Sequence, residues 1–176
     1  IYGGLIFVES SPRAVNEEQA HKVMAAAPLS YVGVFRNADI NDVAAKADAL
    51  SLSAVQLHGD EDQAYIDALR HVLAPQVQIW KAQSVGATLP ARNLKHVDKY
   101  VLDNGQGGTG QRFDWSLLRG EVLDNVLLAG GLSPDNCVEA AKTGCAGLDF
   151  NSGVESQPGI KDASKLASVF KTLRAY

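Results

Sequence analysis

Short apolar runs that lack polar alternation recur along the chain, and they restrict its possible folds more than any other feature. A run of this kind is typical of a strand that is buried on both faces, as the strands of a parallel sheet are. The sequence contains seven of them: Tyr2–Phe7, Tyr31–Phe35, Ala54–Leu57, Gln78–Lys81, Lys99–Leu102, Asn125–Leu128 and Gly147–Phe150.

Helical patterns separate most of these runs. We expect Asn16 to cap the first helix, with Gln19 completing a capping box. Proline at Ser133-Pro134 suits the first turn of a later helix, which Gly144 ends. Further helices are predicted over 39–50, 60–73 and 162–173, and weaker helical segments over 87–94 and 114–118.

Regular alternation of strands and helices predicts an α/β fold with a parallel sheet and right-handed crossovers. A doubly wound open sheet and a (βα)8 barrel both fit this pattern. A complete barrel usually needs at least ~200 residues, and the chain has 176. A buried-type strand also begins at the first residue. We therefore expect one partial domain over residues 1–176, a parallel (βα)8 TIM-type barrel truncated at the amino end to about seven βα units.

Composition argues against several functional classes. The net charge of −4 disfavours a broad face for nucleic acid or for an anionic membrane, although it allows a local cationic pocket. No apolar run approaches the ~20 residues of a membrane helix, and a signal-peptide pattern is missing, so we expect a cytoplasmic protein. Cys137 and Cys145 lack the spacing of a disulfide scaffold or zinc site and are expected to be reduced core thiols.

Polar residues gather at the carboxyl ends of the predicted strands, where barrels carry their active sites. Asp103 ends the fifth strand, and a half-buried carboxyl there can act as a general acid or simply cap a turn. Arg13 can hold an anionic substrate group, and the alternative is a solvated loop arginine. Arg36 leaves the same two possibilities open.

Glycines follow the last three strands. Gly105–Gly110 matches the dinucleotide fingerprint formally, but no long helix opens after it, so a flexible lid or a plain turn is favoured. Gly130-Gly131 and Ser152-Gly153 follow the sixth and seventh strands, where barrels commonly bind phosphate through backbone N–H groups. Two ordinary glycine turns are the alternative.

His58 and Lys81 are of residue types that can act in catalysis, but a structural role is favoured for both. His58 can serve as a catalytic base, but a structural histidine with satisfied hydrogen bonds is favoured. Lys81 permits a Schiff base, but a barrel-interior lysine paired with a carboxylate is favoured. The sequence holds no Ser-His-Asp spacing, metal-ligand cluster or P-loop.

Several longer segments match one family in the right order along the chain. They are Ser11–Arg13, Val32–Phe35, Val55–Gly59, Leu102-Asp103, Gly107–Trp115, Leu128–Leu132, Val138–Ala141, Asp149–Glu155 and Pro158–Asp162. On these segments the chain resembles phosphoribosylanthranilate isomerase of tryptophan biosynthesis. The resemblance is to the enterobacterial form, which is the carboxyl half of a fusion with indole-glycerol-phosphate synthase.

The resemblance implies a barrel that needs no cofactor. It implies an Amadori rearrangement of N-(5-phosphoribosyl)anthranilate to the ribulose-phosphate ketosamine. It assigns the general acid to Asp103 and the contact with the anthranilate carboxylate to Arg13. The residues that enclose the substrate and hold its phosphate would be Gly107, Gly108, Gly110, Gly130, Gly131, Ser152 and Gly153.

The chain departs from the family at the amino end. The family's first strand carries a Lys-x-Cys-Gly motif with the cysteine base, and neither Cys137 nor Cys145 matches that position. We therefore expect the chain alone to be inactive. Expected partners are the phosphoribosyl substrate, the missing first βα unit or a fusion partner domain, and further copies through open barrel edges. A non-catalytic barrel fragment, natural or engineered, with weak phosphate-ligand binding remains an alternative, as does another phosphate-binding barrel of amino-acid biosynthesis.

Overall fold

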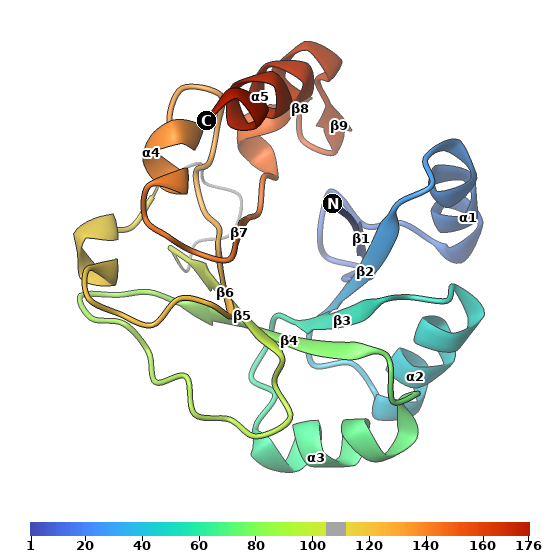
Figure 1. Cartoon of the computed structure of the whole chain (residues 1–176). Helices are drawn as coiled ribbons and strands as arrows, with labels where there is room; N and C mark the ends of the chain where they lie inside the picture. The colour runs from blue at the N-terminus through green and yellow to red at the C-terminus, as the bar shows by residue number, and fades with distance from the viewer. Residues whose placement is uncertain (105–111) are drawn as a thin grey trace. The chain divides into compact units, whose positions relative to one another are not determined.

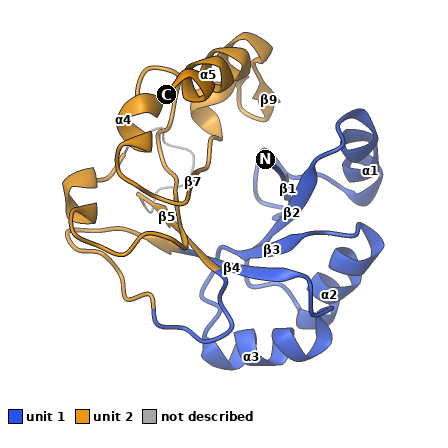
Figure 2. Cartoon of the chain, viewed as in Figure 1, with its two compact units in different colours: residues 1–82, 93–98 blue, residues 83–92, 99–176 orange. Residues whose placement is uncertain are grey.

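The computed structural model describes residues 1–104 and 112–176, which form two compact units (Figures 1 and 2). Unit 1 comprises residues 1–82 and 93–98, and unit 2 comprises residues 83–92 and 99–176. The boundary therefore falls within strand β4 (Gln78–Ser84).

Unit 1 is a parallel sheet whose strands are joined by helices. Its strands follow one another in chain order, with β1 at the edge, and Phe35 lies opposite Leu57 in the register of β2 and β3. The elements are β1 (Tyr2–Ile6), α1 (Glu17–Ala26), β2 (Ser30–Phe35), α2 (Ile40–Ala49), β3 (Ala54–Leu57), α3 (Gln63–Val72) and β4.

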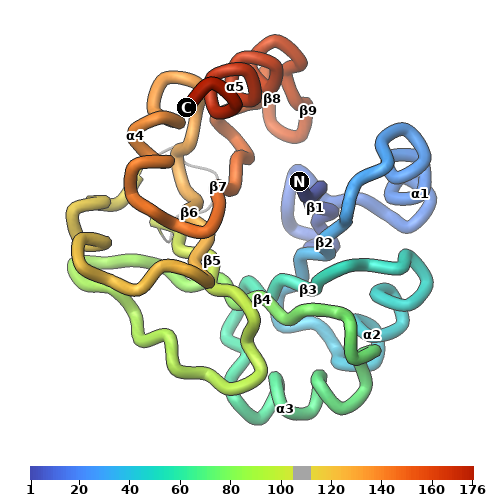
Figure 3. Tube along the Cα trace, in the orientation of Figure 1, coloured from blue at the N-terminus to red at the C-terminus, as the bar shows by residue number. Residues whose placement is uncertain are grey.

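The core of unit 1 lies between its sheet and its three helices, which run along the outer side of the strands (Figure 3). Alternate strand residues contribute to it, among them Phe35, Leu57 and Ile79. On the other face, the rings of Tyr2 in β1 and Trp80 in β4 meet edge to face with centroids 5.1 Å apart. In a flat sheet these outer strands would be about 14 Å apart, so the sheet of unit 1 curls strongly.

Unit 2 holds a second set of parallel strands. Strands β5, β6 and β7 pair in chain order, and β8 and β9 form a separate antiparallel hairpin. Its core includes Leu102, Phe113, Trp115 and Leu128. The elements are β5 (Lys99–Asp103), η1 (Trp115–Leu118), β6 (Val126–Leu128), α4 (Cys137–Ala141), β7 (Gly147–Leu148), η2 (Ser152–Val154), β8 (Glu155–Gln157), β9 (Ile160–Lys161) and α5 (Ala163–Ala175).

The main sequence predictions hold within each unit. All seven predicted strands are found, each is parallel to its neighbours within its unit, and Ala54–Leu57 has the predicted bounds. The capping box is also confirmed. Asn16 Oδ1 accepts from Gln19 N at 2.8 Å, and Gln19 Oε1 accepts from Asn16 N at 2.9 Å.

Two predicted helix starts are wrong. The helix expected from Asp60 begins at Gln63, because the Asp60 N–H donates to Asn37 Oδ1 at 2.7 Å in the preceding turn. The helix expected from Ser133 begins at Cys137. Asn136 Oδ1 accepts from Ser133 N at 2.8 Å and holds residues 133–136 in a turn instead.

The segment after β4 was predicted to contain a weak helix, and it has none. Residues 87–94 contain Pro90, which lacks an amide proton for a helical ladder. A side chain satisfies one of its backbone carbonyl groups instead, because Gln83 Nε2 donates a hydrogen bond to Ala91 O at 2.9 Å. Residues 114–118 form only the short 3-10 helix η1, and the hairpin of β8 and β9 was not predicted.

No helix among the described residues is both long enough and apolar enough to cross a lipid bilayer.

The placement of the core of unit 1 can be tested by replacing a buried leucine and an exposed leucine with alanine. Leu69 in α3 is fully buried, whereas Leu29 before β2 is 42% exposed. We expect Leu69→Ala to lower the free energy of unfolding by about 2–5 kcal/mol, through lost burial and the cavity left behind. Leu29→Ala should lower it by less than about 1 kcal/mol. Urea denaturation measures both, and equal losses would contradict this placement of the core.

Candidate functional site

Asp103 and Gly130 lie against each other at the carboxyl ends of β5 and β6. The Asp103 side chain is half-buried, and its Oδ1 accepts from Asn104 N at 2.6 Å. A Cβ added to Gly130 would lie 2.5 Å from that same oxygen and 3.1 Å from Asn104 N. The glycine therefore makes room for the carboxylate, and the two predicted site residues come together.

The turn after β6 is built from two left-handed glycines. Gly130 has φ +83° and Gly131 has φ +67°, a region where side chains are disfavoured. Asn136 fixes the turn from the far side, because its Nδ2 donates to Gly131 O at 2.9 Å. Two glycines in this conformation let backbone approach a ligand without an intervening Cβ.

The turn after β7 packs directly on the turn after β6. A Cβ added to Gly153 would collide with the carbonyl oxygen of Leu132, so only glycine permits this approach. Lys161 holds the same turn from β9. Its Nζ donates to Asn151 Oδ1 at 2.6 Å and pairs with the buried carboxylate of Glu155 at 2.7 Å. Unit 2 thus gathers Asp103 and both glycine turns at one edge of its sheet.

Arg13 lies at the corresponding edge of unit 1, after β1. Its N–H donates to Ser11 Oγ at 3.1 Å, and the next residue, Ala14, forms a parallel bridge with Ile6. The arginine is half-buried in the loop that follows β1.

A buried ion pair joins three strand ends in unit 1. The side chains of Glu61 and Lys81 are 1% and 7% exposed, and Lys81 Nζ lies 2.8 Å from Glu61 Oε2. Lys81 also donates to Gly59 O at 2.7 Å. Glu61 accepts from Asn37 N at 2.7 Å and from Gly59 N at 2.8 Å. The predicted pairing of Lys81 with a carboxylate is confirmed.

Lys81 does not lie on the face expected for a barrel-interior lysine. In the register of β3 and β4 it stands opposite Leu57, and Leu57 packs in the core beneath the helices. Its ammonium is occupied by the carboxylate and a carbonyl oxygen, so the Schiff-base hypothesis finds no support in this geometry.

The environment of Glu61 favours its charged form. Burial alone raises the pKa of the carboxyl, but the hydrogen bond and charge of Lys81 and the amide of Asn37 outweigh it and hold the pKa below its ordinary value. The effect reaches Tyr65, whose hydroxyl donates to Ala38 O at 2.9 Å. Burial and the negative charges of Glu61 and Asp39 raise the pKa of Tyr65 to about 12.

His58 is exposed, and its side chain has no hydrogen bond or ion pair with any described residue. The structural role favoured for it is therefore wrong.

The two cysteines are free thiols, as predicted. Cys137 is buried at the first residue of α4, and burial raises the pKa of Cys145. Neither lies at the carboxyl end of a strand. Within residues 1–104 and 112–176, no three His, Cys, Asp or Glu side chains are grouped as metal ligands.

Gly107, Gly108 and Gly110 lie outside the described residues, as does the fingerprint-like run that contains them.

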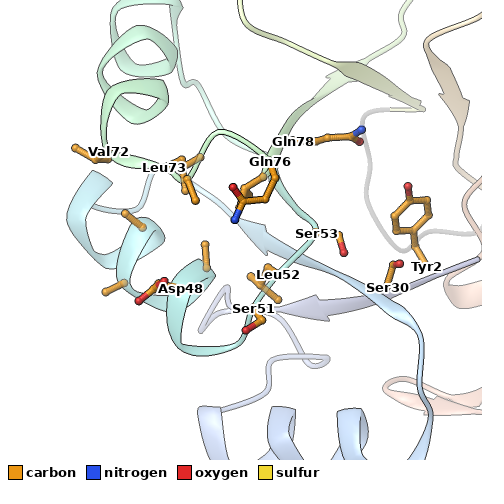
Figure 4. A pocket seen from close by; sticks show the side chains of 15 residues that line it. Tyr2, Ser30, Asp48, Ser51, Leu52, Ser53, Val72, Leu73, Gln76 and Gln78 are labelled. Carbon is orange, nitrogen blue, oxygen red and sulfur yellow. The ribbon is translucent and has the colours of Figure 1, made fainter.

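A hollow with a volume of about 850 Å³ lies at the opposite end of unit 1 from Arg13 (Figure 4). Its polar lining comes from the amino ends of the strands and includes Ser30, Ser53 and Gln78. Ligands of parallel α/β folds bind outside the carboxyl ends, so we do not assign the site to this hollow.

Sequence reasoning missed three residues that shape the site: Glu61, Asn136 and Lys161. Glu61 follows His58-Gly59 by two positions, and a carboxylate so close after a strand was a usable signal. Asn136 contacts Gly131 and Lys161 contacts Asn151, and no local sequence pattern predicts either contact.

Comparison with known proteins matches residues 1–172 to the family model "N-(5'phosphoribosyl)anthranilate (PRA) isomerase". The tryptophan biosynthesis protein TrpCF of Salmonella typhi is 74% identical over all 176 residues. The chain spans 39% of the length of that relative.

Solved structures agree with the sequence match. The phosphoribosyl anthranilate isomerase of Thermus thermophilus aligns with 99% of the chain and 88% of its own, at a TM-score of 0.84 and 29% identity. A second isomerase structure aligns at a TM-score of 0.79 and 28% identity, covering 99% of the chain and 88% of its own. It holds reduced 1-(o-carboxyphenylamino)-1-deoxyribulose 5-phosphate.

Parallel strands in chain order, with polar groups at their carboxyl ends, place the chain among α/β proteins similar to barrel enzymes. The chain belongs to the N-(5'-phosphoribosyl)anthranilate isomerase family. This family assignment sets aside the alternative of a different phosphate-binding barrel.

The buried carboxylate of Glu61 predicts a specific acid sensitivity. Its folded pKa lies below the ordinary 4.5, so its stabilisation is complete above that pH and is lost as the pH falls through the folded value. Glu61→Gln should lower stability by about 3–5 kcal/mol at neutral pH, because Lys81 loses its charged partner. Below about pH 4.5 the difference from the parent chain should narrow.

Urea denaturation from about pH 3.5 to pH 7 measures this difference. Glu18→Gln is the matched control, because Glu18 pairs with Lys22 on α1 with 75% of its side chain exposed. The control should change stability by less than about 1 kcal/mol at any pH. A constant deficit for Glu61→Gln across the range would show that the carboxylate's charge is not what stabilises the turn.

Proposed function

We propose that the chain supplies the general acid and the substrate-binding turns of a phosphoribosylanthranilate isomerase of tryptophan biosynthesis and is inactive alone. The reaction is the Amadori rearrangement of N-(5-phosphoribosyl)anthranilate to the ribulose-phosphate ketosamine. Family membership supports this reaction class, and the relatives named for it are longer than the chain or only partly covered by it.

The contact between Asp103 and Gly130 is the observation that carries the proposal. It joins a half-buried carboxyl, suited to donate a proton, to a glycine turn suited to phosphate. The substrate needs both functions, because its ring oxygen must be protonated while its phosphate holds it in place.

The proposed mechanism assigns one task to each group. Asp103 protonates the furanose oxygen, the ring opens to a Schiff base, and a general base then removes the C2 proton. The resulting enolamine tautomerises to the ketone. Backbone amides of the two glycine turns hold the phosphate, and Arg13 contacts the anthranilate carboxylate. Gly107, Gly108 and Gly110 would enclose the substrate.

The general base is the part of the mechanism that this chain does not supply. The resemblance gives that role to a cysteine on a first strand, and Cys137 and Cys145 lie elsewhere. We infer that the seven strands β1 to β7 correspond to seven of the eight in a (βα)8 barrel. A further βα unit, a fused synthase domain or a second copy of the chain would complete it. Failing that, the chain is a non-catalytic fragment that binds phosphate-bearing ligands weakly.

The contact between Gly130 and Asp103 can be tested in a chimera. The chimera is the Salmonella typhi TrpCF protein with its matching segment replaced by this chain. Gly130→Ala and Gly144→Ala both place a side chain at positive φ, +83° and +80°, but only Gly130 faces a neighbour within 4 Å. Both should lose about 1–2 kcal/mol of stability. Only Gly130→Ala should also lose about 10²-fold in turnover, through displacement of the acid.

Fluorescence loss of phosphoribosylanthranilate follows this turnover. Asp103→Asn should lose about 10²- to 10⁴-fold, as removal of a general acid does. Equal turnover by the two alanine variants, or full activity of Asp103→Asn, would remove the proposed site.

The missing base predicts that the chain alone is nearly inactive. Loss of the base removes about 10²- to 10⁴-fold, and poorer substrate positioning adds to it, so we expect turnover more than about 10³-fold below the chimera. Addition of a first-strand peptide bearing Lys-x-Cys-Gly should restore part of the activity. The same peptide with serine in place of cysteine is the control. Turnover by the chain alone at the chimera's rate would contradict the assignment of the base.

A further inference from the structure

Glu61 fixes two turns of unit 1 that the proposed reaction does not yet use. One oxygen of its carboxylate accepts from Asn37 N after β2, and the other accepts from Gly59 N after β3. The carboxylate is 1% exposed, so water does not replace these bonds. Lys81 on β4 completes the pair, and both turns are thereby tied to the sheet.

The two turns also lock against each other. Asn37 has φ +49°, and its Oδ1 accepts from Asp60 N at 2.7 Å. A Cβ added to Gly59 would collide with the Asn37 side chain. The turns after β2 and β3 therefore have one way to pack, and the residues just before Asn37 and Gly59 are held on rigid backbone.

Those residues are Arg36 and His58, and both are exposed. Neither side chain has a hydrogen bond or ion pair with any described residue. His58 N donates to Phe35 O at 2.8 Å, so the parallel ladder continues one step past Phe35 and Leu57. Because Phe35 and Leu57 pack beneath the helices, alternation directs Arg36 and His58 to the opposite face of the sheet.

Arg36 also shares an edge with Arg13. Strands β1 and β2 are neighbours, with Ile6 opposite Val34, and Arg13 and Arg36 follow their carboxyl ends. A guanidinium on a rigid turn, without a hydrogen bond or ion pair to residues 1–104 or 112–176, can bind a planar anion through two parallel hydrogen bonds. Arg13 is the residue proposed above for the anthranilate carboxylate, so the same planar anion is the ligand that a second arginine on this edge of unit 1 would bind.

We propose that Arg36 is a second arginine for the anthranilate carboxylate, positioned by the network of Glu61, Lys81 and Asn37. The inference rests on the proposed function and adds to it a residue that sets specificity for the carboxylated ring. Arg13 and Arg36 together would neutralise the carboxylate from two adjacent strand ends.

Two ligands test this role, and isothermal titration calorimetry measures their affinities for the chain and for the TrpCF chimera. The first is reduced 1-(o-carboxyphenylamino)-1-deoxyribulose 5-phosphate, and the second is its analogue with an unsubstituted phenylamino ring. Arg36→Gln should weaken the first ligand about tenfold, the contribution of one charge-assisted hydrogen bond. It should change the second by less than about twofold, and Arg36→Lys should restore part of the loss.

Lys22→Gln is the matched control, because it removes one exposed positive charge from the same unit. It should leave both affinities unchanged. Equal weakening of both ligands by Arg36→Gln, or no weakening, overturns the inference. Failure of the unmutated chain and chimera to bind either ligand overturns the proposed function instead.

A separate variant, Asn37→Gly, tests whether the network of Glu61, Lys81 and Asn37 positions Arg36. Asn37→Gly keeps the left-handed backbone accessible and removes the bond to Asp60 N, without breaking the buried ion pair. We expect it to weaken only the carboxylated ligand, by about threefold, because Arg36 must then be ordered on binding. Unchanged affinity for that ligand would overturn the positioning role of the network.

Discussion

Parallel pairing is the constraint from which the arrangement of both units follows. Parallel strands are buried on both faces, so their faces are apolar and polar side chains are pushed to the strand ends. Within each unit all strands run in the same direction, so the residues that follow the strands lie at the same edge of the sheet. Asp103, Gly130 and Ser152 share an edge in unit 2 for this reason, as Arg13 and Arg36 do in unit 1.

The buried pair of Glu61 and Lys81 is best understood through the backbone groups that it satisfies. A buried ion pair is often no more stabilising than apolar side chains of similar volume, because both charges lose their water. An apolar pair here would leave the amides of Asn37 and Gly59 without the acceptor that Glu61 provides. Each unsatisfied buried amide costs about 1–3 kcal/mol, which explains why a carboxylate suits this position.

The sequence predicted what depends on local pattern and missed what depends on contacts from elsewhere. Seven strands and the capping box of Asn16 follow from runs and spacings of a few residues, and both are found. The start of α4 was misplaced because Asn136 binds Ser133 and Gly131, and these contacts outweigh the preference of Pro134 for a first helical turn. A local signal cannot report this competition.

The candidate site also has features that the sequence predicted and features that depend on contacts between distant residues. Topology alone predicted that Asp103 and the glycine turns would share an edge, because their strands are parallel neighbours. Their direct contact depends on backbone angles that no residue pattern specifies. Lys81 was expected to pair with a carboxylate, and its partner is Glu61 in the adjacent turn, whose position soon after a strand was a signal that the sequence analysis did not use.

Glycine meets three different needs in this chain, and the differences locate the site more sharply than composition does. Gly144 adopts positive φ with open space around it, which only a turn requires. Gly153 lacks room for a side chain against Leu132, and Gly130 combines positive φ with contact to Asp103. At Gly130 the backbone angle and the neighbouring carboxylate therefore both require glycine. In a chain of net charge −4, an anionic phosphate held there would be bound by backbone amides that such close approach exposes, rather than by a surplus of basic side chains.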